Sequence, residues 1–171
     1  MDARSLSRTG LLAAGAVAAY VFESLLPMPL PWARIGLSNV FVVIALFGFG
    51  FKDAFLVNLA RVLAGNLLLG ILLSPAFVFS FAGSTCALMA MAVVRWKLVP
   101  PLSVVGASCI GAAVNNFVQV MLFTTILSWS GIASSLLGGF ILMGVGVGFV
   151  TGLIASRVLD KVILERTGSV G

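Results

Sequence analysis

The chain has 171 residues, of which 61% are hydrophobic and only 9% charged, and its mean hydropathy of +1.21 is far above that of soluble domains. These values exclude a disordered chain, a disulfide scaffold and a coiled coil, and they predict a single integral membrane domain over residues 1–171. The formal net charge of +5 does not predict nucleic-acid binding, because the basic residues lie in short segments between apolar runs.

Six apolar segments predict an all-α membrane protein with six transmembrane helices, because each is long enough to cross a lipid bilayer as a helix. A proline-rich connector around Trp32 follows the first segment, and Pro100 and Pro101 follow the fourth. A cleaved signal peptide is the alternative for the first segment, which is longer than a usual signal core. The expected spans are residues 10–26, 35–51, 54–73, 76–94, 102–127 and 132–156, with a charged cytoplasmic tail at 157–171.

The positions of the basic residues predict that both ends of the chain lie in the cytoplasm. Cytoplasmic loops of multi-pass proteins carry an excess of lysine and arginine. With the N-terminus inside, the outer loops contain only Arg34 among the basic residues. The inner segments contain Arg4, Arg8, Lys52, Arg95, Lys97, Arg157, Lys161 and Arg166. The even number of spans agrees with this orientation.

Arg61 lies within the third span, roughly 10 Å inside the hydrocarbon at about 1.5 Å per helical residue. An arginine at this depth costs at least ~2.5 kcal/mol unless it is paired or faces water, so we expect it to have a partner. Asn58, Arg61 and Gly65 are spaced by three and four residues, so this face should point into the bundle. A structural arginine bonded to carbonyls or a glutamate, and a binding-site cation, are both open interpretations.

Further polar side chains are expected near Arg61, in the outer half of the membrane. Ala107, Gly111, Asn115 and Gln119 form a stripe in the fifth span that changes from small to polar residues. Amide hydrogen bonds that join helices are the alternative role for each amide. The predicted pocket opens to the outside and is lined by Arg61, Asn58, Asn115, Asn116, Gln119 and Asn39, with Glu23 and Arg34 at its outer mouth.

The charges of this pocket favour a ligand with an anionic group. Arg34 and Arg61 together outweigh Glu23 by one positive charge. An ion pair between Glu23 and Arg61 would weaken this inference, because it would neutralise the cation.

Small residues spaced by four predict contacts between helices, since association in lipid depends on close approach of the backbones. Such faces occur at Ala14 and Ala18 in the first span, at Ala107 and Gly111 in the fifth, and at Gly144, Gly148 and Gly152 in the sixth. Packing inside the bundle is the expected role of each face, and a partner surface is the alternative.

The residues that catalysis or metal binding requires are scarce. The chain has no histidine, and Cys86 and Cys109 lie in apolar runs without metal-ligand spacing. Apart from Glu23, the carboxylates lie near the ends or in the turn after the second span, and there is no phosphate-binding loop. We therefore expect no catalytic residue, no metal and no cofactor, and neither a self-sufficient enzyme nor an ATPase.

Several polar motifs resemble those of one bacterial family, in the same order along the chain. They are Glu23-Ser24-Leu25-Leu26-Pro27, Gly36-Leu37-Ser38-Asn39, Lys52-Asp53-Ala54, Leu59-Ala60-Arg61-Val62-Leu63, and Asn116 with Gln119. From about Leu11 to Ile154 the chain resembles the small membrane proteins called Gx transporters, also labelled heptaprenyl diphosphate synthase component I. One departure is Asn115, where the resemblance implies a histidine.

This resemblance implies a six-helix bundle similar to the S components of energy-coupling factor (ECF) transporters, in the bacterial cytoplasmic (inner) membrane. An S component captures a small molecule from outside and meets a transmembrane coupling subunit that two ATPases drive. Ala14 and Ala18 look like the alanine motif of that contact. The resemblance therefore implies a substrate-binding component of an importer, with a small-molecule ligand and these proteins as partners.

Two other functions remain open from the sequence. The synthase label favours a noncatalytic membrane subunit associated with heptaprenyl diphosphate synthesis, although no aspartate pair could hold the magnesium ions that a prenyl transferase uses. A purely structural subunit of a membrane complex would have a core without a pocket.

Overall fold

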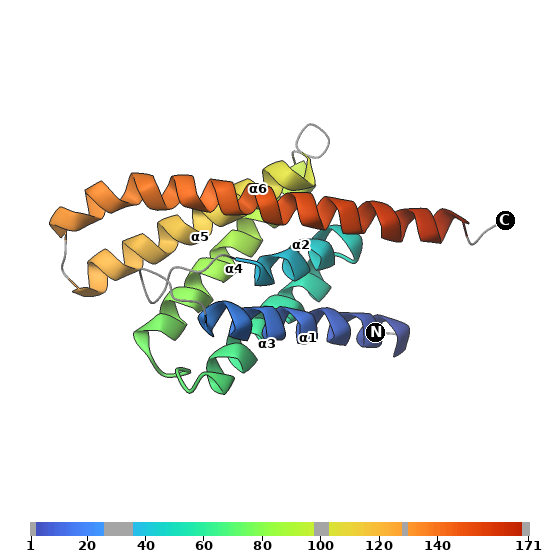
Figure 1. The fold of residues 1–171 in the computed structure, drawn as a ribbon, viewed down its shortest axis with the longest axis horizontal. Coiled ribbons are helices and arrows are strands. Elements are labelled where there is room, and N and C mark those ends of the chain that lie inside the picture. The colour runs from blue at the N-terminus through green and yellow to red at the C-terminus, as the bar shows by residue number, and fades with distance from the viewer. Residues whose placement is uncertain (1–2, 26–35, 98–102, 128–129, 169–171) are drawn as a thin grey trace.

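The computed structural model describes residues 3–25, 36–97, 103–127 and 130–168, and the side chains of 5–25, 36–97, 103–126 and 137–162. The regular elements in these ranges are all helices, which confirms the predicted all-α class. In chain order they are α1 (Ala3–Leu25), α2 (Ser38–Gly48), α3 (Phe51–Leu68), α4 (Pro75–Lys97), α5 (Val104–Leu127) and α6 (Ser130–Gly168), shown in Figure 1.

The short helix α2 lies at the centre of the bundle and supplies much of its core. It contacts α1, α3 and α6, and to a smaller extent α4 and α5. Val42, Val43, Ala45 and Leu46 on α2 are almost completely buried. The longer helices pack around it, α1 against α3 and α5 against both α4 and α6. Every described helix therefore contacts the element that begins next to Glu23 and Arg61.

Four helices are long and apolar enough to cross a membrane, over Ser5–Leu25, Pro75–Lys97, Val104–Ile126 and Leu137–Val162. α2 has only 11 residues, and α3 has 18 but carries Lys52, Asp53 and Arg61. The length and composition of these four helices indicate a multi-pass membrane protein. The count of six spans and the orientation with both ends inside remain predictions.

Four helices have bounds that differ clearly from those expected. α1 begins at Ala3 rather than at residue 10. α2 is shorter than the expected span 35–51, because Gly36 (φ 80°) and Gly50 (φ 116°) adopt backbone angles that glycine tolerates and other residues rarely do. α3 covers Phe51–Leu68 rather than 54–73, and Gly70 (φ 69°) follows its end. α6 continues to Gly168, so most of the segment expected as a tail is helical.

Two of the three small-residue faces pack inside the bundle, as predicted. A side chain at Gly148 or Gly152 would collide with the backbone of α5, and one at Gly111 would collide with Met91 of α4. Ala14 and Ala18 on α1 are instead exposed, so the expectation of internal packing is wrong for this pair. Spacing alone predicts a close contact, but it does not tell which side of the helix faces the bundle.

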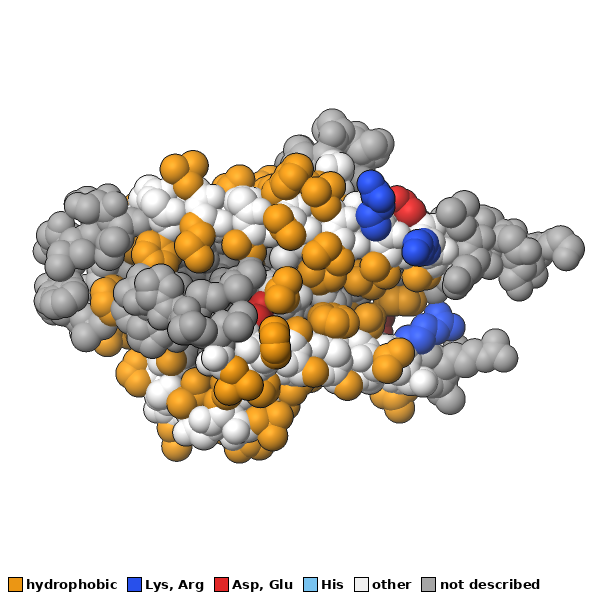
Figure 2. Space-filling view, in the orientation of Figure 1, with side chains coloured by type: hydrophobic (Ala, Val, Ile, Leu, Met, Phe, Trp, Pro, Cys, Tyr) orange, Lys and Arg blue, Asp and Glu red, His pale blue; other side chains and the backbone are white. Residues whose placement is uncertain are grey.

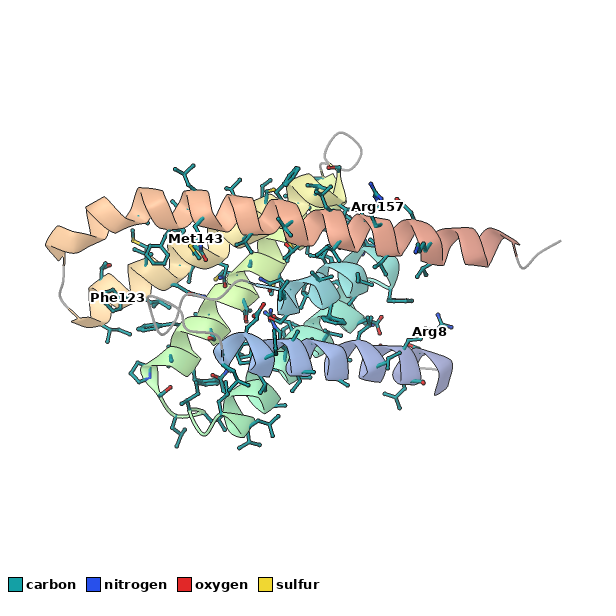
Figure 3. All side chains as sticks on the ribbon, viewed as in Figure 1. Arg8, Phe123, Met143 and Arg157 are labelled. Atoms are coloured by element: carbon teal, nitrogen blue, oxygen red, sulfur yellow. The ribbon has the colours of Figure 1, made fainter. Side chains whose placement is uncertain are left out.

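Basic side chains gather at one end of the molecule, which Figure 2 shows near the start of α1 and the second half of α6. Arg8 of α1 lies 5.8 Å from the centre of the Phe49 ring after α2, and the Thr9 hydroxyl donates to Asp53 of α3. We call this region the basic end; its described cations are Arg8, Lys52, Arg95, Lys97, Arg157 and Lys161. Figure 3 shows Arg8 and Arg157 toward this end and Phe123 and Met143 toward the other.

Candidate ligand pocket

Arg61 is 4% exposed and is held by polar side chains of α2 and α3. Its Nη1 donates to the Ser38 hydroxyl at 3.0 Å and to Asn39 Oδ1, and its Nη2 donates to Asn58 Oδ1 at 2.7 Å. Asn58 is 2% exposed and Gly65 is also buried, which confirms that this face of α3 points inward. Arg61 therefore has partners, as expected, and they include one hydroxyl and two amides.

Glu23, near the end of α1, is joined to Arg61 through Ser38. Its carboxylate accepts the backbone N–H of Ser38 at 3.2 Å and the Ser38 hydroxyl at 3.3 Å. Glu23 is 1% exposed, so it is buried rather than placed at an open mouth. A buried carboxylate and a buried guanidinium are each costly unless bonded, and Ser38 at the first turn of α2 bonds to both.

A second polar group, which the sequence did not reveal, joins α1, α3 and α4. Asn66 Nδ2 donates to the Tyr20 hydroxyl at 2.7 Å, and this hydroxyl donates to Ser80 Oγ at 3.1 Å. Gly65 makes room for the Tyr20 ring, because any side chain there would collide with it. Tyrosine and serine are unremarkable within an apolar helix, and their partners lie 46 and 60 residues away in the chain.

The amides of α5 form a wall of donors beside this group. Gln119 donates to Asn115 at 3.2 Å, Asn115 to Asn116 at 3.3 Å, and Asn116 to the backbone carbonyl of Phe140 in α6 at 2.7 Å. Gly83 of α4 allows Asn115 and Gln119 to approach closely. Each amide has two N–H donors, and these bonds use one of each. The second N–H of each amide can therefore bond to a ligand or to water.

These groups line one cavity of about 40 Å³, which is space for a few water molecules. It lies in the half of the bundle away from the basic end, between the end of α1, the start of α2, the start of α4 and the α5–α6 pair. Its polar lining is Tyr20, Glu23, Ser38, Asn39, Arg61, Ser80, Ser84, Asn115, Asn116 and Gln119. Met143 and Val147 of α6 are among the apolar residues that close it.

Most of the predicted site residues come together at this cavity. Glu23, Asn39, Arg61, Asn115, Asn116 and Gln119 line it. Asn58 does not line it but bonds to Arg61, and Arg34 lies outside the described residues. A role of these residues in binding a ligand stays a prediction. The polar lining residues that the sequence analysis missed are Tyr20, Ser38, Ser80 and Ser84.

The charges of the described lining are balanced, since it contains one carboxylate and one guanidinium that share Ser38. The excess positive charge expected from the sequence depended on Arg34, so the described lining gives no net charge that would attract an anion. The donor groups of α5 are the feature that favours a ligand, because unused N–H groups favour a ligand rich in acceptor oxygens. In the part of the chain with described side chains, no three His, Cys, Asp or Glu residues are grouped to hold a metal ion.

Comparison with known proteins gives one family. The model of the family described as heptaprenyl diphosphate synthase component I matches residues 12–158, which include every residue of the cavity lining. No curated protein and no solved structure gives a significant match to the chain.

Proposed function

The chain belongs to the heptaprenyl diphosphate synthase component I family, and from this premise and the pocket geometry we propose that it is a substrate-binding component of a small-molecule importer. In this proposal it captures a small ligand with an anionic, acceptor-rich group from the outer side of the bacterial cytoplasmic membrane. It acts without catalytic residues of its own, in the manner of the S components of ECF transporters.

The observation that carries the proposal is a cavity with ten polar lining residues inside an apolar bundle. Buried polar groups in a membrane protein are costly and tend to mark ligand or ion sites. A purely structural network would use its donors within the protein. Here the second N–H groups of Asn115, Asn116 and Gln119 are left for a further acceptor.

The small volume of the cavity implies that a ligand must displace part of its wall. Met143 lines the cavity and is 40% exposed, so it can move outward without disturbing the core. A methionine side chain has three rotatable bonds and adapts to different shapes. We therefore place the entry path at the α5–α6 wall, beside Met143.

The proposed partner surface is the exposed face of α1. Ala14 and Ala18 lie on it with Leu11 (75% exposed) and Phe22 (58% exposed). Small residues flanked by large apolar ones allow another transmembrane helix to approach closely. A coupling subunit that carries two ATPases would dock here, and the chain itself would lie with both ends in the cytoplasm.

A stability screen tests the proposed pocket. The purified protein is heated with small carboxylates, phosphates and diphosphates, because a ligand that binds only the folded state raises the melting temperature. The double variant Asn115→Leu/Gln119→Leu removes donors from the wall, and Thr125→Leu is the matched control, since Thr125 is exposed on the same helix. A shift that the double variant loses and the control keeps supports the proposal, whereas equal shifts in all three proteins contradict it.

The family description favours a second candidate, a noncatalytic membrane subunit associated with heptaprenyl diphosphate synthesis. Purification from the native membrane separates the two functions. A copurifying soluble prenyl synthase, with no coupling subunit or ATPase, would favour the second candidate. The reverse composition would favour the importer.

A further inference from the structure

A second concave site, distinct from the polar pocket, lies at the basic end between α2, α3 and α4. It is a groove of about 600 Å³, far larger than the polar pocket. Its lining is mostly apolar and includes Leu46, Phe51, Met89, Val93, Arg95 and Trp96. Trp96 is 87% exposed, and Val93 and Met89 are about half exposed. The groove is therefore an open apolar surface with one cation in its wall.

The groove lies where the membrane meets water. Arg95 and Trp96 belong to the last turn of α4, at the end of the membrane-crossing segment Pro75–Lys97. Tryptophan prefers this boundary because its ring is apolar and its N–H is polar. Val93 and Met89 lie about one and two turns closer to the middle of α4. An occupant would thus meet a cation at the boundary and apolar side chains deeper in the bilayer.

The charges around the groove favour a negative group at this boundary. Arg95 lies 5.9 Å from the centre of the Phe47 ring, and no carboxylate of the described residues pairs with it. Lys52 and Lys97, which are exposed, adjoin the lining residues Phe51 and Trp96 in the chain. Asp53, the acid of this region, already accepts the Thr9 hydroxyl. Among the described residues that line the groove or adjoin its lining in the chain, three are cations and the one acid already accepts a hydrogen bond.

We propose that this groove is a binding site for one anionic phospholipid. Its acyl chain lies along Met89 and Val93, and its phosphate contacts Arg95 beside the ring of Trp96. Basic pockets between transmembrane helices bind anionic head groups in this way. The proposal depends only on the chain being embedded in a membrane and is independent of the importer function.

Trp96 provides a direct reporter of the occupant. The other two tryptophans are replaced in the variant Trp32→Phe/Trp129→Phe, so that all tryptophan fluorescence comes from Trp96. This protein is reconstituted into phosphatidylcholine vesicles that contain increasing fractions of brominated phosphatidylglycerol or, in parallel, brominated phosphatidylcholine. Bromine quenches tryptophan only at close range. Half-maximal quenching should occur at a fraction of brominated phosphatidylglycerol about fivefold lower than that of brominated phosphatidylcholine. One arginine near a membrane surface raises the affinity for an anionic lipid by about this factor.

Three further variants in the same background identify the site. In Arg95→Gln the two brominated lipids should reach half-maximal quenching at the same fraction. Ala92→Phe, which fills the groove without changing its charge, should have the same effect. Arg157→Gln removes an equal charge from an exposed position on α6, and it should keep the preference. Equal quenching by the two lipids in the parent protein, or a preference that survives both Arg95→Gln and Ala92→Phe, would overturn the proposal.

Discussion

At the scale of single residues, Ser38 connects the two buried charges of the pocket. Its backbone and hydroxyl bond to Glu23, and its hydroxyl also accepts from Arg61. A hydroxyl serves here because it donates to one group while it accepts from another. The positions of Glu23 and Arg61 therefore depend on a residue that carries no charge.

Replacing Ser38 by alanine should lower the free energy of unfolding by about 1–3 kcal/mol, since both charges lose a buried hydrogen-bond partner. Denaturant titration in mixed micelles measures the change. Ser7→Ala is the control because Ser7 is exposed on α1, and it should change stability by less than ~0.5 kcal/mol. Similar changes in the free energy of unfolding for the two variants would show that Ser38 does not connect Glu23 and Arg61.

The pair Glu23 and Arg61 should be strongly coupled. Removing one charge of a buried pair leaves the other uncompensated, so Glu23→Gln and Arg61→Gln should each cost about 3–5 kcal/mol. The double variant should cost less than the sum of the two by at least ~1 kcal/mol, because no lone charge remains. A double-mutant cycle of unfolding free energies measures this difference, and additive values would contradict the coupling.

The sequence predicted these residues to different degrees. Arg61 and the amides stood out because such side chains are rare in apolar spans and need partners. Ser38, Tyr20 and Ser80 did not, because hydroxyl groups are common in such spans. Their contacts connect helices far apart in the chain, and no local pattern records them.

At the scale of helices, glycine sets both the boundaries and the packing. Gly36 and Gly50 flank α2, which makes the most central helix also the shortest. Hydropathy predicted the four long helices well, because an apolar run of their length has few other stable forms. It did not predict the extension of α6 to Gly168, since helical structure there continues beyond the apolar run.

Two glycines of α6 should respond differently to the same substitution. A Cβ at Gly148 would collide with the α5 backbone, so Gly148→Ala should destabilise the protein by about 1–3 kcal/mol. A Cβ at Gly146 has no atom within 4 Å, so Gly146→Ala should be neutral or stabilising by up to ~1 kcal/mol, because alanine favours the helix. Thermal unfolding compares the two variants. Equal destabilisation would mean that α6 does not pack on α5 through Gly148.

At the scale of the whole molecule, the polar pocket and the basic end occupy opposite halves of the bundle. The cations of the basic end come from α1, α3, α4 and α6, and they lie toward the same end of the bundle although they are far apart in sequence (Figure 2). Positive charge faces the cytoplasm in multi-pass proteins. The pocket should then lie in the outer half of the membrane.

Cysteine labelling tests this orientation. In a background in which Cys86 and Cys109 are alanine, Leu73→Cys places a thiol in the turn after α3, where Leu73 is 98% exposed. A membrane-impermeant maleimide should label it in intact cells. Lys97→Cys, at the end of α4, should be labelled only after the cells are permeabilised. Labelling of Lys97→Cys in intact cells would show that the topology is the opposite one, with the pocket in the inner half of the membrane.

If the polar cavity holds a small ligand, the protein should retain that ligand through gentle purification, and mass spectrometry can identify it. The wild type and the variant Asn115→Leu/Gln119→Leu are extracted gently from the native membrane, and their small molecules are released and compared. This variant changes none of the residues that bond Glu23, Ser38 and Arg61 to one another, and its melting temperature checks that it is folded. We predict an anionic metabolite, near one per protein, that the variant loses. A wild-type protein that retains no small molecule, or a molecule that both proteins retain equally, would show that the cavity is not a ligand site.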